Sequence, residues 1–395
     1  MLDFEFYCPS RVLFGRNAME SLPAMLKKYN ATKVMLAHYG NDSIPAPVDQ
    51  ARQALESSAI PFVEFTGIKA NPMLSRILEG IKVCRESEID FLLAVGGASV
   101  IDTVKSIAAG SMLPEGVDFW KDYVFPKNRF SEALPLGVVL TIPAAGSETS
   151  FGLCITNDET LAKRYTGGEC LIPKFAVMNP EFSMTLPPYQ TASGVVDIIA
   201  HLAERYFVNF PDVDLSDRLI EACIRTLLIN GPIVMNDPNN YAARAEIMWT
   251  GSIAHNKILE AGRTHGDWAS HDMSHELGGF YDLTHGAALG ILMPAWMKYV
   301  YKNNPEKFEQ FARRVFDVDI AYDKREDAIL QMISRFENFV RSMGLPVKLS
   351  DAGIDDSRFE EMSRSAMAGR KHLGTGNGIV LLREKEFIDI FRMAL

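Results

Sequence analysis

The sequence predicts two domains: an α/β domain with a parallel, Rossmann-like sheet over residues 1–186, then an all-helical domain over residues 187–395. A chain of 395 residues exceeds the size at which one hydrophobic core keeps growing. Its first half alternates short apolar runs with segments of helical period, which is typical of a parallel α/β layer. After Thr185-Leu186-Pro187-Pro188, apolar residues recur every three or four positions. We place the boundary there because proline seldom lies inside a helix.

Five apolar, β-branched runs predict the strands of the first domain: Val34–Ala37, Phe62–Phe65, Phe91–Val95, Val138–Ile142 and Ala176–Met178. Between the second and third runs, Asn71 and Pro72 predict the N-cap and first residue of a helix that ends near Ser87. The segments Phe4–Tyr7 and Val12–Phe14 alternate like an edge hairpin. Parallel sheets bind ligands beyond the carboxyl ends of their strands, so the residues that follow each run are the first candidates for a site.

Composition excludes several classes of protein. The formal net charge is -10, which argues against a surface that binds phosphate backbones, so we expect no nucleic-acid partner. The five cysteines form no C-x-x-C pair, which indicates a reducing compartment. Asp3 and Glu5 stand where a secretory signal needs basic residues, and weakly polar runs such as Leu134–Gly146 are too short to span a bilayer. We expect a cytoplasmic protein with no membrane partner.

A turn of small residues separates the run at Phe91–Val95 from an amphipathic helix: Gly96, Gly97, Ala98 and Ser99. Backbone amides at the start of that helix, aided by its dipole, favour a bound pyrophosphate. The same residues would also form a tight strand-to-helix turn with no ligand. The turn lacks the G-x-G-x-x-G pattern, and the chain has no P-loop Gly-Lys pair. A second small-residue turn, Pro143–Thr149, follows the run at Val138–Ile142.

Half of the eight histidines fall within one short stretch of the second domain: His265, His271, His275 and His285. His271 and His275 share one face of a helix predicted over Trp268–Leu277, which Gly278-Gly279 should end. A following helix predicted over Thr284–Met293, with Thr284 as N-cap, carries His285 in its first turn.

Asp197 and His201 lie four residues apart in an otherwise apolar helix. A buried carboxylate beside an imidazole is costly without compensation, which a divalent cation would supply. With two of the later histidines they would form a one-carboxylate, three-imidazole site suited to Fe²⁺ or Zn²⁺. Spacing alone does not choose between His271 and His275. The alternative is a satisfied Asp-His hydrogen bond together with surface histidines.

These segments resemble the iron-containing (group III) metal-dependent alcohol dehydrogenases, within them the butanol dehydrogenase and aldehyde reductase branch. The resemblance covers the whole chain, in the following segments: Pro9–Gly15, Ala94–Asp102, Thr141–Glu148, Thr185–Pro188, Gly194–His201 and Asp267–Gly286. It implies reversible hydride transfer between a nicotinamide cofactor and a primary alcohol or aldehyde, with the metal as a Lewis acid.

When the family's pattern is matched to this sequence position by position, the resemblance implies four metal ligands: Asp197, His201, His271 and His285. It leaves His275 near the nicotinamide, where we expect a catalytic proton relay. It implies that the cofactor's phosphates are held by Gly96, Gly97, Ala98, Ser99 and Asp102, with Asn71, Thr141, Ile142, Ser147 and Lys163 nearby and Leu186 toward the nicotinamide. Ala98 replaces the usual third glycine of this turn.

A second departure is the turn Tyr39-Gly40-Asn41-Asp42-Ser43, where the branch often has Tyr-Gly-Gly-Gly-Ser. We expect Gly40, Asn41, Asp42 and Ser43 near the adenosine ribose. Asp42 would accept a hydrogen bond from a 2'-hydroxyl and repel a 2'-phosphate, so we predict NAD(H) in preference to NADP(H). The resemblance and the predicted edge hairpin together favour a homodimer.

Two other functions stay open at this point. A lyase resembling dehydroquinate synthase would also use NAD and a metal, but it needs several basic residues for a phosphorylated acid. The metal motifs are instead flanked by aromatic residues, although Arg263 is a counterexample. A non-catalytic nucleotide-binding redox sensor would bind metal and nucleotide without turnover.

Overall fold

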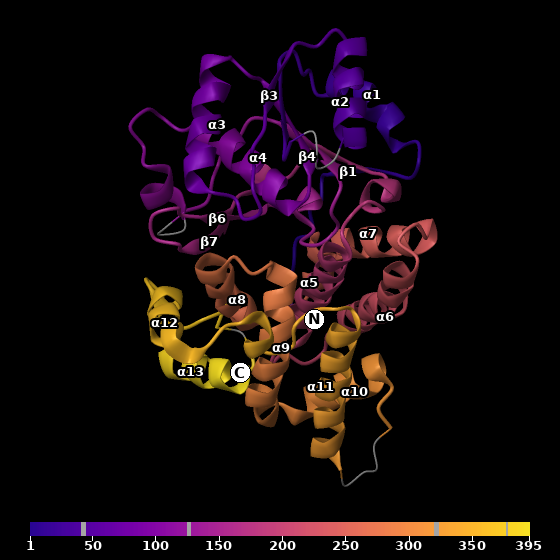
Figure 1. Cartoon of the computed structure of the whole chain (residues 1–395), viewed down its shortest axis with the longest axis vertical. Coiled ribbons are helices and arrows are strands. Elements are labelled where there is room, and N and C mark those ends of the chain that lie inside the picture. Colours follow the sequence, from indigo (N-terminus) through magenta and orange to yellow (C-terminus); the bar gives the residue numbers. More distant parts are fainter. Residues whose placement is uncertain (41–44, 125–127, 320–323, 377) are drawn as a thin grey trace. The chain divides into compact units, whose positions relative to one another are not determined.

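The computed structural model describes residues 1–40, 45–124, 128–319, 324–376 and 378–395. The chain divides into two compact units, one formed by Tyr7–Leu186 and the other by Met1–Phe6 together with Pro187–Leu395. Figure 1 shows strands and helices in the first unit and helices throughout the second. The predicted fold class, a parallel α/β unit with a helical unit, is therefore confirmed.

The first unit contains a six-stranded sheet in the order β1-β8-β5-β4-β2-β3, with every pair parallel. Its strands are β1 (Arg11–Phe14), β2 (Val34–His38), β3 (Phe62–Phe65), β4 (Phe91–Gly96), β5 (Leu136–Leu140) and β8 (Phe175–Met178). Every residue of β2, β4, β5 and β8 is buried, as expected for strands covered on both faces. The five predicted strands are confirmed, with β5 ending before Ile142.

Four α-helices accompany this sheet in the described residues: α1 (Leu22–Lys28), α2 (Pro45–Ser57), α3 (Leu74–Glu86) and α4 (Ala98–Met112). Leu22 of α1 and Val48 of α2 lie in one buried cluster with Leu36 of β2 and Leu93 of β4. An antiparallel hairpin of β6 (Gly152–Thr156) and β7 (Lys163–Gly167) stands apart from the main sheet.

Two expectations for this unit are wrong. Asn71 does not cap α3, because its backbone is left-handed with φ 62° and the helix begins at Leu74 with Met73 as N-cap. The N-terminal hairpin does not form either. Phe4–Tyr7 is not a strand, and β1 satisfies its backbone by pairing in parallel with β8.

The second unit contains nine α-helices in the described residues: α5 (Pro188–Tyr206), α6 (Asp214–Asn236), α7 (Tyr241–His255), α8 (Ala269–Tyr281), α9 (His285–Val300), α10 (Pro305–Phe316), α11 (Arg325–Ser342), α12 (Phe359–Met367) and α13 (Glu384–Met393). Helix α5 is buried along most of its length and packs mainly against α9 and α6. Its side chains are thus held on several sides by neighbouring helices, which is what a precisely positioned site requires.

Two helix ends differ from the sequence-based expectation. Helix α8 continues through Gly278 and Gly279 and ends before Asp282, whose φ is 53°. Helix α9 continues past Met293 with Pro294 inside it. Both helices pack against each other, and such tertiary contacts outweigh the local preference of glycine and proline to end a helix.

Among the described helices, α6 alone is long and apolar enough to cross a membrane by length and composition. This is weak evidence, because a core helix passes the same test. Ile220, Ile224 and Leu227 of α6 are fully buried within the unit.

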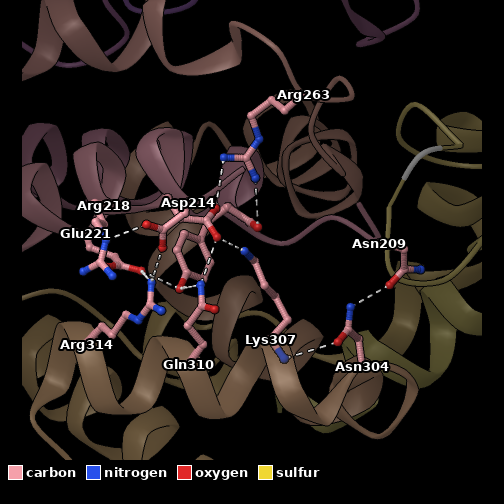
Figure 2. A network of polar contacts seen from close by, with 11 residues as sticks. Asn209, Asp214, Arg218, Glu221, Arg263, Asn304, Lys307, Gln310 and Arg314 are labelled. Carbon is pink, nitrogen blue, oxygen red and sulfur yellow. Dashed lines mark hydrogen bonds and ion pairs between the residues drawn. The ribbon is translucent and has the colours of Figure 1, made fainter. Parts of the chain in front are cut away.

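A polar network joins α10 to α6 and to the segment before α8, as Figure 2 shows. Asp217 Oδ1 accepts a hydrogen bond from Arg263 Nη1 at 3.3 Å, and Asp217 Oδ2 accepts one from Gln310 Nε2 at 2.9 Å. Lys307 forms an ion pair with the same carboxylate. Arg263 Nη2 also donates to the Tyr206 carbonyl at 3.2 Å. The network therefore ties the segment that precedes α8 to the C-terminal end of α5.

Candidate metal centre

Asp197 and His201 project from the same face of α5, one helical turn apart, and both are buried. His271 approaches them from α8, and its ring centroid lies 4.5 Å from that of His201. Each of these three residues offers a ligand atom, and the three atoms all lie within 4.8 Å of one another. The structure thus selects His271 for this cluster, a choice that spacing left open.

His285, the first residue of α9, completes the arrangement. Its Nε2 atom lies 3.7 Å from Asp197 Oδ1, and its ring centroid is 5.2 Å from that of His271. His285 thus lies beside the group formed by Asp197, His201 and His271, and the four residues together offer one carboxylate and three imidazoles. Nitrogen and oxygen donors in this number suit Fe²⁺ or Zn²⁺.

The three imidazoles are oriented in the same way. Their Nδ1 atoms lie near acceptors: the Asp197 carbonyl at 2.9 Å from His201, Glu204 Oε1 at 3.1 Å from His271, and Ser274 Oγ at 3.2 Å from His285. A histidine that donates through Nδ1 presents Nε2 as its metal-binding nitrogen. Within the described residues, His271 Nε2 and Asp197 Oδ1 are buried and form no hydrogen bond. These orphaned atoms fit a bound cation.

Electrostatics give the cluster the protonation states that metal binding requires. Burial by itself would raise the pKa of Asp197, but the nearby His285 and His201 hold it well below its usual value. Burial, reinforced by His201, lowers the pKa of His271 well below its usual value. The cluster therefore offers an ionised carboxylate and a neutral imidazole, the forms that bind metals.

The other two histidines of the stretch lie outside the cluster. His275 is buried on α8, and its ring stacks on that of His285 with centroids 5.6 Å apart. His265 is largely exposed, and its Nδ1 lies 3.2 Å from Glu260 Oε2. The sequence grouped all four histidines, whereas the structure brings only His271 and His285 to Asp197.

Two functional candidates escaped the sequence analysis, Glu204 and Arg205, which follow His201 by one turn of α5. Glu204 is fully buried and contacts His271. Arg205 donates to the His201 carbonyl and to His255 Nδ1, both at 2.8 Å. The sequence does contain an indication of both residues, because two adjacent charged residues in an otherwise apolar helix need compensating partners when they are buried.

In the first unit, the residues predicted to bind the cofactor follow three neighbouring strands. Gly40 follows β2, Gly96 and Gly97 join β4 to α4, and Thr141 follows β5. A Cβ atom on Gly96 would lie 2.5 Å from Val100 Cγ2, and one on Gly97 would lie 2.7 Å from Ile142 Cβ. The turn therefore requires glycine at both positions. Thr141 Oγ1 is buried without a hydrogen bond among the described residues, an orphan that fits a polar ligand.

Four further predicted residues form two side-chain pairs. Asp102 Oδ1 accepts a hydrogen bond from Ser147 Oγ at 2.6 Å, and Lys163 Nζ donates to Asn71 Oδ1 at 2.9 Å. The Asp102 carboxylate also accepts from the Cys154 amide at 2.8 Å, so both of its oxygens are engaged within the unit. Ala98 and Ser99 begin α4, and Leu186 is the last residue of the unit. Asn41, Asp42 and Ser43 lie outside the described residues.

Lys105, which the sequence analysis missed, connects α4 to three backbone carbonyls of residues 147–152 by hydrogen bonds. It is fully buried, and its Nζ donates to the carbonyls of Ser147, Ser150 and Gly152 at 2.7–2.9 Å. Burial lowers the pKa of Lys105 to about 8, and burial raises the pKa of Asp102.

Comparisons with known proteins agree with this arrangement. Residues 9–180 match the family described as "Iron-containing alcohol dehydrogenase", and residues 191–395 match "Fe-containing alcohol dehydrogenase family, C-terminal". The chain is 38% identical to "Probable NADH-dependent butanol dehydrogenase 1" of Bacillus subtilis, covering 100% of both chains. It is 35% identical to "NADPH-dependent aldehyde reductase YqhD" of Escherichia coli, covering 96% of this chain and 97% of the relative. A crystal structure of NADH-dependent butanol dehydrogenase A from Thermotoga maritima superposes with a TM-score of 0.94 at 33% identity, covering 100% of this chain and 99% of that one.

Proposed function

The chain belongs to the iron-containing alcohol dehydrogenase family, and from this premise we propose how its own residues carry out the reaction. It is an oxidoreductase that interconverts alcohols and aldehydes with a metal and a nicotinamide cofactor. The observation that carries the proposal is the convergence of ligand atoms from Asp197, His201 and His271, with His285 beside them.

The proposed ligands are one carboxylate oxygen of Asp197 and the Nε2 atoms of His201, His271 and His285. The donor set accepts Fe²⁺ or Zn²⁺, and we propose Fe²⁺ as the resident ion because of the family. A bound ion supplies a Lewis acid that lowers the pKa of an alcohol and polarises an aldehyde oxygen. The buried Asp197 carboxylate contributes the negative charge that makes a cation stable there.

His275 is the proposed proton relay. It is buried, lies one helical turn after His271 on α8 and stacks on His285, so it stands beside the proposed ligands without belonging to their cluster. An imidazole in this position can pass a proton between the substrate oxygen and solvent at neutral pH.

The cofactor's pyrophosphate is proposed to bind at Gly96, Gly97, Ala98 and Ser99, where α4 begins. Asn71, Asp102, Thr141, Ile142, Ser147, Lys163 and Leu186 complete the proposed cofactor contacts. Relatives include NADH-dependent and NADPH-dependent enzymes, so family membership does not decide between the nucleotides. We propose NAD(H), with the adenosine ribose near Gly40, Asn41, Asp42 and Ser43, because Asp42 would repel a 2'-phosphate.

We propose a cytoplasmic homodimer as the working state. Strand β1 forms one edge of the six-stranded sheet, and Phe14 on it is 42% exposed. An exposed strand edge is a ready site for pairing with a second copy. A sedimentation measurement of the purified protein tests the dimer.

The lyase alternative loses its main support. Two basic residues lie near the metal motifs, and both side chains are buried: Arg263 is paired with Asp217, and Arg205 is paired with Glu260. Both are therefore occupied within the helical unit and are not offered to a phosphorylated acid.

The decisive experiment follows absorbance at 340 nm with butanal and NADH after reconstitution with Fe²⁺ or Zn²⁺. Metal-dependent NADH oxidation is expected. Binding of both ligands without turnover would favour the redox sensor, and metal-dependent conversion of a phosphorylated acid without net NADH oxidation would favour the lyase.

A further inference from the structure

The carboxylate of Glu204 lies directly behind His271. Glu204 is fully buried on α5, and its Oε1 atom lies 3.1 Å from His271 Nδ1 and 3.1 Å from the His271 amide. Its Oε2 atom accepts a hydrogen bond from the Trp268 amide at 2.7 Å, and the Ser270 hydroxyl also donates to this carboxylate. A buried carboxylate with so many donors around it is fixed in one position.

Glu204 also replaces a missing helix cap. Trp268, the N-cap residue of α8, has a left-handed backbone with φ 65° and makes no side-chain cap. The amides at the start of α8 need acceptors, and the Glu204 carboxylate supplies them from a different helix. A negative charge at this end of α8 is also favoured by the helix dipole. The carboxylate therefore fixes the first turn of α8, which carries His271.

The same contact determines which nitrogen of His271 carries the proton. The backbone amides around Glu204 can only donate, so its oxygens act as acceptors and His271 Nδ1 is the donor. His271 Nε2 then has a lone pair, and that buried atom forms no hydrogen bond within the described residues. His201 Nδ1 instead lies 2.9 Å from the Asp197 carbonyl and 3.2 Å from Asp197 Oδ1, and His285 Nδ1 faces the Ser274 hydroxyl. Glu204 is thus the one carboxyl group that faces the Nδ1 atom of a proposed ligand without itself belonging to the cluster.

We propose that Glu204 is a positioning residue of the metal centre, which fixes the tautomer and the ring orientation of His271 so that Nε2 meets the ion. The inference rests on the proposed function, because it needs a metal at Asp197, His201 and His271. Carboxylates that hold a ligating histidine in this way typically strengthen metal binding by about 10–100-fold.

The first test measures Zn²⁺ affinity by competition with a chromogenic chelator, using the full chain stripped of metal. Glu204→Gln keeps the size of the side chain and replaces its carboxyl group by an amide, and we expect its Zn²⁺ affinity to fall by about 10–100-fold. Glu221→Gln is the matched control, since it makes the same change at another buried carboxylate, which bonds to Tyr206 and Arg314 and contacts no proposed ligand. Its affinity should stay near that of the wild type. An equal loss in both variants, or no loss in Glu204→Gln, overturns the proposal.

A double-mutant comparison tests whether Glu204 acts through His271. In a His271→Ala background, Glu204→Gln should cause no further loss of Zn²⁺ affinity, because the group that it positions is gone. A further loss as large as that in the wild-type background overturns the proposal. Should His271→Ala itself retain wild-type affinity, the proposed metal centre is wrong. Loss in His271→Ala with wild-type affinity in Glu204→Gln refutes only the role of Glu204.

A second measurement is made on the wild-type protein, and a variant is needed only to assign its signals. In ¹⁵N NMR of the zinc-loaded wild-type protein, with His271 assigned by its disappearance in His271→Ala, Nδ1 should carry the proton and Nε2 should bear the metal shift. The opposite assignment of the two nitrogens overturns the proposal.

Discussion

The Nε2 atom of His285 lies 3.7 Å from Oδ1 of Asp197, which places the first residue of α9 against the middle of α5. The extensive packing of α5 against α9 holds the two residues at this distance. The candidate metal centre is therefore a property of the helical core, and its ligands do not depend on an exposed loop. Because rigid elements fix the ligand geometry, single substitutions at the site should have distinct effects.

The first prediction separates the metal ligands from the proton relay. His271→Ala should purify with much less metal than the wild type, because it removes an imidazole from the cluster of ligand atoms. His275→Ala should retain metal near the wild-type content while kcat falls by about 100–10,000-fold, the usual contribution of a general acid-base group. Metal analysis after gel filtration, together with turnover at 340 nm, measures both effects.

The control for this pair is His265→Ala, because His265 is exposed and outside the cluster. It should retain both metal and activity. Equal metal contents in His271→Ala and His275→Ala would show that the proposed ligand set is wrong.

The second prediction concerns the glycine turn. Gly97→Ala should lower the free energy of unfolding by about 1–3 kcal/mol, because its new Cβ would lie 2.7 Å from Ile142 Cβ. It should also weaken NADH binding about 10-fold or more, since relieving this clash must shift the turn that carries the proposed phosphate-binding amides. Chemical denaturation and a fluorescence titration with NADH measure the two quantities.

The control shortens Ile142, the side chain with which the new methyl group would clash. In an Ile142→Ala background, Gly97→Ala should cost less stability than in the wild type, because the crowded atoms are gone. If the cost is the same in both backgrounds, the steric explanation fails.

The third prediction is a dependence of stability on pH that Lys105 should cause. Burial lowers the pKa of Lys105 from 10.5 to about 8, so the unfolded chain binds more protons at this residue between those pH values. Stability should therefore rise with pH across that window, by up to about 3 kcal/mol for this residue. Urea denaturation of the wild type and of Lys105→Met, from pH 7.5 to 9.5, measures the difference. A difference that stays constant or shrinks as pH rises would contradict the shift.

Much of the fold was predictable because its signals are local. Buried parallel strands are continuous apolar runs, and the runs at Val34–Ala37 and Phe91–Val95 correspond closely to the buried strands β2 and β4. Helix ends were less predictable, since Gly278-Gly279 lies inside α8, where packing against α9 outweighs the helix-breaking tendency of glycine.

The candidate site was predictable as a set of residue types and less so as an arrangement. The spacing of Asp197 and His201 predicted a shared helix face, and the structure confirms it. The choice of His271 depends on how α8 is rotated against α5, a tertiary property that spacing does not contain. Lys105 was missed because it acts through distant backbone groups, and no local motif records such contacts. Glu204 was missed although its charge lies in an apolar helix, because that pattern does not say which groups compensate it.

The last prediction concerns the choice of nucleotide. With Asp42 in place, kcat/KM should be higher for NADH than for NADPH, because a carboxylate near the ribose repels the 2'-phosphate. Asp42→Gly should move the ratio toward NADPH by about 10-fold or more, which corresponds to about 1.4 kcal/mol of relieved repulsion. Asp49→Asn is the matched control, since it changes the net charge by the same amount at an exposed position of α2. Initial rates with both nucleotides at a fixed butanal concentration measure the ratio. If the wild type favours NADPH, or if Asp49→Asn shifts the ratio as much as Asp42→Gly, then Asp42 does not set the preference.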